Sequence, residues 1–375
     1  MGRIKGLYIA FHDADPSAGV SQKIFSQVDA FNDNGVDMSL LTYKSKNGIR
    51  TAYVDNQELA PVYSGIKCVF FEIKLYPKIV KLIEDNKVVL LFIRYTQRID
   101  YFYLRFLRKC KQLNCTILLE IPTYPYDGEF ANQSFKHKMQ ILVEKFFRRF
   151  LKFYVTRIVT TSEFKTILGI DSIRISNAVD DRKLRLAAHT KKSCDEIMMI
   201  SVANISFWHG LDRLIKGLYN YYLYPRDISV KLTIVGGGDK VEISKVLDLI
   251  SNLNLQQYVT YVGPKHGTEL NVLYDKADLA VGCLACHRKN ILEVKSLKNV
   301  EYAMRGFPFF YSENNTDFDD KPYVFKVPAD DTDIIVEQIV DFYMGLSIKP
   351  DEIRASVSNL TWDNQIKKIL EDSIC

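Results

Sequence analysis

Short apolar runs alternate with longer amphipathic segments along most of the chain. The first run, Leu7–His12, is followed by a polar loop that ends at Gly19. An amphipathic helical segment comes next and ends at Asn34, and a second apolar run covers Met38–Tyr43. A strand, a glycine-containing loop, a helix and a strand in this order begin a parallel α/β unit. The pattern therefore predicts an α/β fold.

The same alternation begins again after a polar segment without apolar periodicity, and that segment is expected to be a linker. The chain has 375 residues, more than one hydrophobic core usually supports. We therefore expect an N-terminal Rossmann-like domain over 1–180, a linker over 181–195 and a second Rossmann-like domain over 196–358. A C-terminal helix over 359–375 could dock back on the N-terminal domain. Two such domains facing each other would hold one ligand in the cleft between them.

The net charge and the cysteines indicate which ligands and which compartment are compatible with the chain. A net charge of +5 allows an anionic ligand or an acidic membrane surface and does not require nucleic acid. No apolar run is long enough to span a bilayer. The cysteines are odd in number and scattered, as is typical of a reducing, cytoplasmic compartment.

One basic segment could contact either a membrane surface or its own domain. Residues 136–157 mix aromatic and aliphatic side chains with lysine and arginine. This suits a basic amphipathic helix at a membrane surface, which would make the protein peripheral on the inner face of the membrane. It equally suits a helix that packs its apolar side on its own domain.

Three short motifs match known binding motifs only in part. Cys283 and Cys286 form one C-x-x-C with no second pair, so two cysteines at a strand end are expected and no metal site. Asp13 and Asp15 match a D-x-D motif that binds divalent metal ions in another protein fold. They directly follow the first strand, which is the wrong place for that motif, so no metal site is expected there. The glycines at 236–238 lack the third glycine of a dinucleotide fingerprint, so they predict a tight strand-to-helix turn.

Two glutamates carry the most informative chemistry. Glu293 and Glu301 flank Ser296, which could cap a helix and leave the backbone N–H groups of Leu297 and Lys298 free. Such N–H groups and the helix dipole form an anion site. One carboxylate could then lie on each side of a bound diphosphate. The alternative is an ordinary helix with two solvated acids.

This stretch, with Gly306 and Pro308 after it, resembles the donor site of retaining glycosyltransferases of family 4, the E-x7-E type. Other motifs agree in order: the loop ending in Gly19, residues 176–180, residues 202–210, residues 232–238, and Val262-Gly263. The resemblance implies the GT-B architecture of two Rossmann-like domains. It also implies a retaining transferase of hexosyl type that takes a sugar from a UDP or GDP sugar. The expected acceptor is a hydroxyl of a saccharide or lipid-linked saccharide in bacterial-type polysaccharide biosynthesis, with neither cofactor nor metal.

The resemblance also implies roles for single residues. Glu293 would hold the donor sugar, Glu301 the ribose, and the amides of Ser296 and Leu297 the distal phosphate. The Gly19 loop would close over the diphosphate and the acceptor. The remaining expected donor-binding residues are Lys298, Asn204, His209, Gly236 and Gly263.

Two departures affect these roles. The family commonly has Arg and Lys where this chain has Asn204 and His209. A leaving diphosphate needs a cation or oriented dipoles. The candidates are the basic residues around the first glutamate: Arg288, Lys289, Lys295 and Lys298, of which Arg288 and Lys289 join Glu293 and Gly19 as predicted catalytic residues. On the acceptor side the family often carries a histidine after the strand at 116–121, and here the polar candidates are His12, Glu120 and Asp127.

Two other functions fit the same architecture. A nucleotide-sugar epimerase or hydrolase would need an acid and a base placed in the cleft. A subunit that binds the sugar nucleotide without turning it over is the non-enzymatic alternative, suggested by Asn204 and His209.

Overall fold

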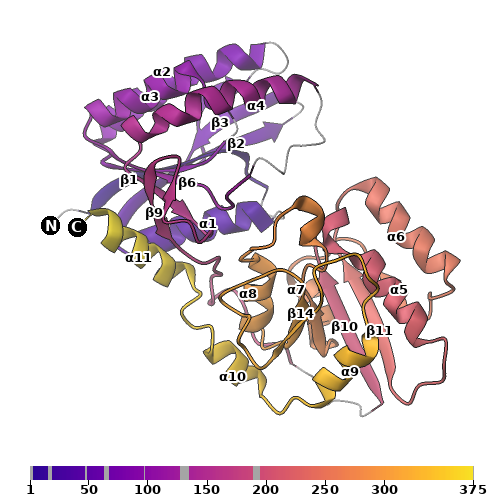
Figure 1. Cartoon of the computed structure of the whole chain (residues 1–375). Helices are drawn as coiled ribbons and strands as arrows, with labels where there is room; N and C mark the ends of the chain where they lie inside the picture. Colours follow the sequence, from indigo (N-terminus) through magenta and orange to yellow (C-terminus); the bar gives the residue numbers. More distant parts are fainter. Residues whose placement is uncertain are drawn as a thin grey trace. The chain divides into compact units, whose positions relative to one another are not determined.

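A computed structural model describes residues 3–15, 19–46, 49–62, 67–96, 98–126, 135–188 and 195–374. The chain forms two compact units (Figure 1). Unit 1 comprises residues 1–176 and 361–375, and unit 2 comprises residues 177–360. Both units are parallel-sheet α/β structures, as the alternating sequence pattern predicts.

The sheet of unit 1 has the strand order β4-β3-β2-β1-β5-β6-β7-β9-β8. Strands β2, β1, β5, β6, β7 and β9 run parallel, while β3, β4 and β8 pair antiparallel at the two edges. The central strands are continuously apolar because both faces of the sheet are covered. Their bounds are β1 Ile4–Asp13, β2 Val36–Lys46, β3 Ile49–Val54, β4 Gln57–Val62, β5 Leu90–Arg94, β6 Thr116–Glu120, β7 Arg157–Thr160, β8 Thr166–Ile167 and β9 Ile170–Arg174.

Helices α2, α3 and α4 cover one face of this sheet, and α1 and α11 lie on the other (Figure 1). Helix α11 is the C-terminal segment, and its Gln365 side chain accepts a hydrogen bond from the backbone N–H of Ser176 at 2.9 Å. The side chain of Asn34, just after α1, donates to Asp363 at 2.8 Å. The last helix is therefore part of unit 1. The bounds are α1 Gly19–Asp33, α2 Lys67–Asn86, α3 Tyr101–Gln112, α4 Phe135–Phe147, the 3-10 helix η2 Arg148–Phe153, and α11 Trp362–Ile374.

The sheet of unit 2 is parallel throughout, in the order β12-β11-β10-β13-β14-β15. The order reverses between β10 and β13, and in such sheets ligands bind outside the carboxyl ends of the strands at this switch point. The strands are β10 Glu196–Val202, β11 Ser229–Val235, β12 Val259–Tyr261, β13 Leu279–Val281, β14 Phe309–Tyr311 and β15 Val324–Lys326.

The helices of unit 2 lie between these strands in sequence and after the last one. They are η3 Phe207–His209, α5 Leu211–Tyr221, α6 Lys240–Asn252, α7 Gly267–Asp275, η4 Cys286–Lys289, α8 Leu297–Met304, α9 Val336–Met344 and α10 Pro350–Ala355. The predicted linker at 181–195 is described only in part. Its residues 181–188 pack on unit 2, where Ala187 is buried and donates a backbone hydrogen bond to Arg305 at 3.0 Å.

The three glycines at 236–238 form the turn between β11 and α6, and Asp239 caps that helix by accepting from the N–H of Val241. Gly236 has a φ of +136°, and a Cβ added there would lie 1.8 Å from the carbonyl oxygen of Ala203. The loop after β11 thus packs directly on the loop after β10. Gly237 has no atom within 4 Å of such a Cβ.

We predict that Gly236→Ala lowers the free energy of unfolding by about 3 kcal/mol, because the new Cβ meets backbone and the left-handed φ is strained. Gly237→Ala is the matched control and should change stability by less than about 1 kcal/mol. Urea unfolding of both variants measures the difference. Equal stability of the two variants would show that the close approach of these loops is wrong.

Candidate functional site

The carboxyl ends of β10 and β13 are joined by one side chain from α8. The Tyr302 hydroxyl accepts a hydrogen bond from the N–H of Val202 and donates one to the carbonyl of Val281, each at 3.1 Å. Tyr302 is fully buried. This pair of bonds fixes α8 at the switch point of the sheet.

Helix α8 begins beside this switch point with Ser296 in an extended conformation, and the Ser296 hydroxyl makes no capping hydrogen bond. The first N–H groups of a helix have no partner within the helix and carry partial positive charge. The amides of Leu297 and Lys298 belong to this first turn. The start of α8 therefore suits an anion, as the sequence predicts.

The two glutamates lie on either side of that turn along the chain. Glu293 is exposed in the preceding loop, which is held to the segment after β14 by hydrogen bonds from Val294 to Asn314 at 3.0 Å and from Asn314 to Leu292 at 2.6 Å. Glu301 lies within α8 and accepts from the guanidinium of Arg305 at 3.1 Å. The backbone at both glutamates is thus held in place.

The loops after β10, β11 and β12 adjoin one another at the same edge of the sheet. The N–H of Ile205, next to Asn204, donates to Gly237 at 2.7 Å, and the N–H of Gly236 donates to Gly263 at 2.9 Å. Asn204 itself is exposed. The structure therefore brings together positions 204, 236 and 263, which the sequence analysis expects to bind the donor.

Three of the four candidate cations already have partners. Arg288 binds Asp212 through two nitrogens, each at 2.9 Å, and these hydrogen bonds raise its pKa further above its ordinary range. Lys289 lies over the ring of Trp208, 4.4 Å from its centre. Lys295 pairs with Asp317 at 3.4 Å. Lys298 differs, because its ammonium nitrogen is buried and has no hydrogen-bond partner among the described residues.

A buried polar cluster lies at the ends of β13 and β14. It contains His209, Cys283, Cys286, Asn299 and Glu313, all of them less than 7% exposed. Burial lowers the pKa of His209, and the charge of Lys298 lowers it further. Burial also raises the pKa of Glu313 well above its ordinary value, although Lys298 opposes this shift.

The two thiols of this cluster influence each other. A hydrogen bond from Cys286 lowers the pKa of Cys283 and raises that of Cys286. The ligand atoms of Cys283, Cys286 and Glu313 lie within 4.8 Å of one another, so these are the described residues with the spacing of a metal site. Sequence reasoning identified the cysteine pair but missed Asn299 and Glu313. Their signal in the sequence was position alone: Asn299 lies in the first turn of α8, and Glu313 follows the last residue of β14 by two positions.

The acceptor-side candidates belong to unit 1. Gly19 is the first residue of α1, with open space where a Cβ would be. His12 lies near the end of β1, and Asp127 falls outside the described residues.

Glu120, at the end of β6, is 1% exposed and belongs to a buried ion network. It pairs with Lys23 at 3.1 Å and Arg94 at 2.8 Å, and it accepts from Gln27 at 3.0 Å. Burial alone would raise its pKa, but the two cations and these hydrogen bonds outweigh burial and hold the pKa at about 2. The sequence suggested Glu120 as a sugar contact, but its carboxylate is buried inside unit 1 and paired with two cations.

Solved structures with the same fold are glycosyltransferases. One from Rickettsia africae has a TM-score of 0.69 and 14% identity, covering 100% of this chain and 98% of that one. Sucrose-phosphate synthase from Thermosynechococcus elongatus has a TM-score of 0.65 and 15% identity, with 99% of each chain covered. Anabaena HepE in complex with UDP has a TM-score of 0.65 and 12% identity, covering 98% and 100%. The chain has the GT-B fold. No protein-family model and no curated protein matches the sequence.

We predict that Glu120→Gln destabilises unit 1 by about 3–5 kcal/mol, since it leaves Lys23 and Arg94 buried without their counter-charge. Glu163→Gln, which breaks the exposed pair with Arg174, should cost less than about 1 kcal/mol. Denaturant unfolding measures both.

The same network predicts a pH dependence. The folded pKa of Glu120, about 2, lies below its ordinary value of 4.5, so its contribution to stability is complete above pH 4.5. We expect about 3 kcal/mol to be lost as the pH falls from 4.5 towards 2, and the loss to be absent in Glu120→Gln. If parent and variant lose stability equally over this range, Glu120 is not the titrating group.

Proposed function

We propose that this chain is a glycosyltransferase that takes its sugar from a nucleoside diphosphate sugar. The observation that carries the proposal is the start of α8, where an uncapped helix N-terminus lies between Glu293 and Glu301 at the switch point of a parallel sheet. The fold supports it, because structures of the same fold hold UDP and UDP-glucose in Anabaena HepE.

In the donor orientation we propose, the diphosphate lies against the first turn of α8. Glu301 accepts hydrogen bonds from the ribose hydroxyls, and Glu293 accepts them from hydroxyls of the sugar. Carboxylates make strong charge-assisted hydrogen bonds with such donors. The paired guanidinium of Arg305 keeps Glu301 in place.

The finer parts of the proposal concern mechanism and acceptor. We propose a transferase of the family 4 type that moves a hexose with retention to a hydroxyl of a saccharide or lipid-linked saccharide, in polysaccharide biosynthesis in the cytoplasm. The departing phosphate would accept the proton of the acceptor hydroxyl. Transfer would need neither a cofactor nor a metal ion.

A thermal-shift screen with UDP, GDP and their sugars tests the donor class. A ligand at a hundred times its dissociation constant stabilises the folded protein by roughly 2.7 kcal/mol, which is easily measured as a rise in Tm. Incubating the bound donor with and without saccharide acceptors then separates the possible activities. Acceptor-dependent transfer supports the proposal. Donor consumption without acceptor indicates an epimerase or hydrolase, and binding without turnover an inactive subunit.

The two glutamates should fail in different ways. Glu301→Gln should weaken the nucleoside diphosphate and the donor alike, by about 1–3 kcal/mol, because the ribose does not change during the reaction. Glu293→Gln should lower kcat and leave diphosphate binding nearly intact, because positive charge develops on the sugar only in the transition state. Calorimetry with the diphosphate and steady-state kinetics measure both effects. The control is Glu242→Gln in α6, which removes the partner of the exposed Lys245. If Glu293→Gln turns over normally, the donor binds in the reverse orientation or at another site.

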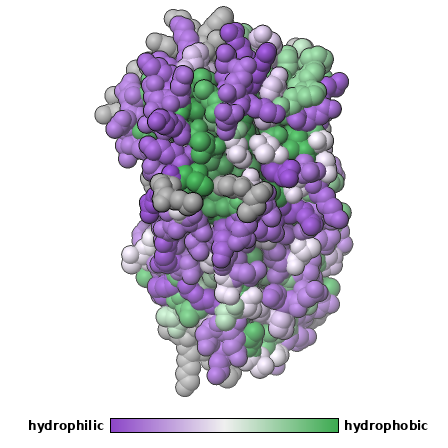
Figure 2. Space-filling model, turned by 90° about the vertical axis from the view of Figure 1, so that its left-hand side faces the viewer, coloured by the Kyte–Doolittle hydropathy of each residue, from purple (hydrophilic) through white to green (hydrophobic). Residues whose placement is uncertain are grey.

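We also propose that unit 1 contacts an anionic membrane surface through α3, α4 and η2. Leu142, Phe146 and Phe153 are each more than half exposed, as is Tyr101 of α3. Apolar side chains reach the surface of the upper part of the molecule in Figure 2, among hydrophilic ones. Within the described residues, no helix combines the length and apolar character needed to cross a bilayer.

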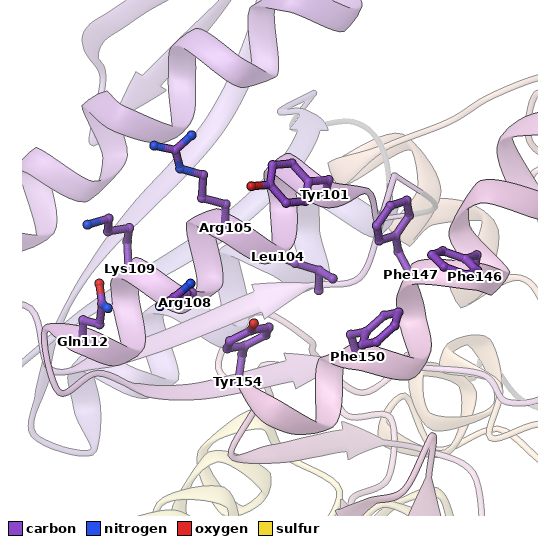
Figure 3. A pocket seen from close by; sticks show the side chains of 10 residues that line it. All are labelled: Tyr101, Leu104, Arg105, Arg108, Lys109, Gln112, Phe146, Phe147, Phe150 and Tyr154. Carbon is purple, nitrogen blue, oxygen red and sulfur yellow. The ribbon is translucent and has the colours of Figure 1, made fainter.

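A cavity of about 510 Å³ lies between these elements. In Figure 3 the rings of Phe146, Phe147 and Phe150 gather at one end, and Arg105 and Lys109 of α3 lie at the other. Aromatic and basic groups side by side suit the boundary between lipid tails and anionic headgroups. The basic residues of α3 add to those that the sequence identified in 136–157.

Arg105, Arg149 and Lys152 are exposed, whereas Arg148 is largely buried and pairs with Glu144. We predict that changing the three exposed residues to Glu weakens binding to phosphatidylserine vesicles by at least about 3 kcal/mol, at about 1 kcal/mol for each basic residue. The control changes Lys240, Lys245 and Lys265 of unit 2 to Glu. If co-sedimentation with vesicles is absent in the parent, or falls equally in both variants, the proposed membrane surface is wrong.

A further inference from the structure

The buried ammonium group of Lys298 makes no hydrogen bond within the part of the chain that the structure describes. Lys298 is the second residue of α8, and its nitrogen is shielded from solvent without a hydrogen bond to any described residue. An unpaired charge that is removed from water is costly, and proteins seldom keep one without a counter-charge. This ammonium group therefore points to a ligand that brings negative charge.

The groups near Lys298 supply little of that charge. His209 is kept neutral by burial and by Lys298 itself. Glu313 is only 1% exposed, has one carboxylate oxygen without a partner, and is biased towards its protonated form by burial. Cys283 also lies near Lys298, and its sulfur interacts with the thiol of Cys286 through a hydrogen bond.

Four other cations of unit 2 are already held in ion pairs. Arg288 is held by Asp212 and Asp331, and Lys295 by Asp317. Arg305 is held by Glu301, and Lys326 by Asp319. Each would have to break an ion pair to reach a new anion, whereas Lys298 would not.

We propose that Lys298 is the cation that binds the donor diphosphate and neutralises it as it leaves. This rests on the proposed glycosyltransferase function. Lys298 and the first amides belong to the same turn of α8, so the charge of the ammonium group adds to the partial positive charge of the helix start. In the reaction, the bond between the anomeric carbon and the phosphate oxygen breaks and its electron pair stays on the diphosphate. The acceptor oxygen bonds to the anomeric carbon, and its proton passes to the diphosphate. Charge grows on the diphosphate during this step, so a fixed cation lowers the barrier.

The test compares the parent with Lys298→Met, Lys298→Arg and Lys295→Met. Calorimetry measures affinity for UDP and GDP and for the matching nucleosides, and donor kinetics give kcat. We expect Lys298→Met to weaken the diphosphate about 10- to 100-fold, as for loss of a hydrogen bond to a charged group, and to lower kcat as well. Nucleoside affinity should change less than about twofold, Lys298→Arg should recover much of the loss, and Lys295→Met should match the parent. Lys298→Met should melt at or above the Tm of the parent, because it removes an unpaired buried charge.

Each contrary result has a distinct meaning. A parent that binds neither UDP nor GDP overturns the proposed function and this proposal together. Binding and turnover by the parent with an unchanged Lys298→Met overturns the role of Lys298 alone, as does an equal loss in Lys295→Met. A stoichiometric metal ion at Cys283, Cys286 and Glu313, whose removal reproduces the loss seen in Lys298→Met, would show that the metal supplies the charge instead.

Discussion

The hydrogen bonds of Tyr302 are the constraint on which the candidate donor site depends. One hydroxyl satisfies the N–H of Val202 and the carbonyl of Val281, two strand ends that separate where the sheet order reverses. Because the same residue lies in α8, the start of that helix is fixed at the switch point. The amides of the first turn, Lys298 and Glu301 take their positions from this helix. The close approach of Gly236 to Ala203 fixes the neighbouring loops in the same way.

In unit 1 the strand ends are held together by a buried ion network. There a buried carboxylate, Glu120, is neutralised by Lys23 and Arg94 and ties β5 and β6 to α1. The ammonium of Lys23 also lies 5.1 Å from the ring centre of Trp362 in α11, so the network reaches the C-terminal helix. The charges of Glu120, Lys23 and Arg94 are thus paired in unit 1, whereas the buried nitrogen of Lys298 in unit 2 has no hydrogen-bond partner in the described segments. This contrast is the physical basis for assigning charge recognition to unit 2.

The fold was largely predictable because apolar runs of strand length and amphipathic helices alternate regularly in both halves. The start of α8 was also predictable, since Ser296 and the flanking glutamates lie close together in sequence. Partners distant in sequence were not predictable. The sequence offered four candidate cations around Glu293 and favoured Arg288 and Lys289 as catalytic. The ion pairs with Asp212 and Asp317 distinguish Arg288 and Lys295 from Lys298. Glu120 was a polar residue at the end of a predicted strand and so a candidate sugar contact. Its burial beside Lys23 of helix α1 could not be predicted from the sequence.

Hydrogen exchange of the whole chain with and without UDP and GDP tests the central claim most directly. If the diphosphate binds the first turn of α8, the nucleotide that binds should slow exchange at Leu297, Lys298 and Asn299, whose amides gain a partner or lose contact with water. The loops after β10 and β12 should be protected with them, while β3 and β4 of unit 1 should be unchanged. Binding of either nucleotide without protection at the start of α8 would contradict the account.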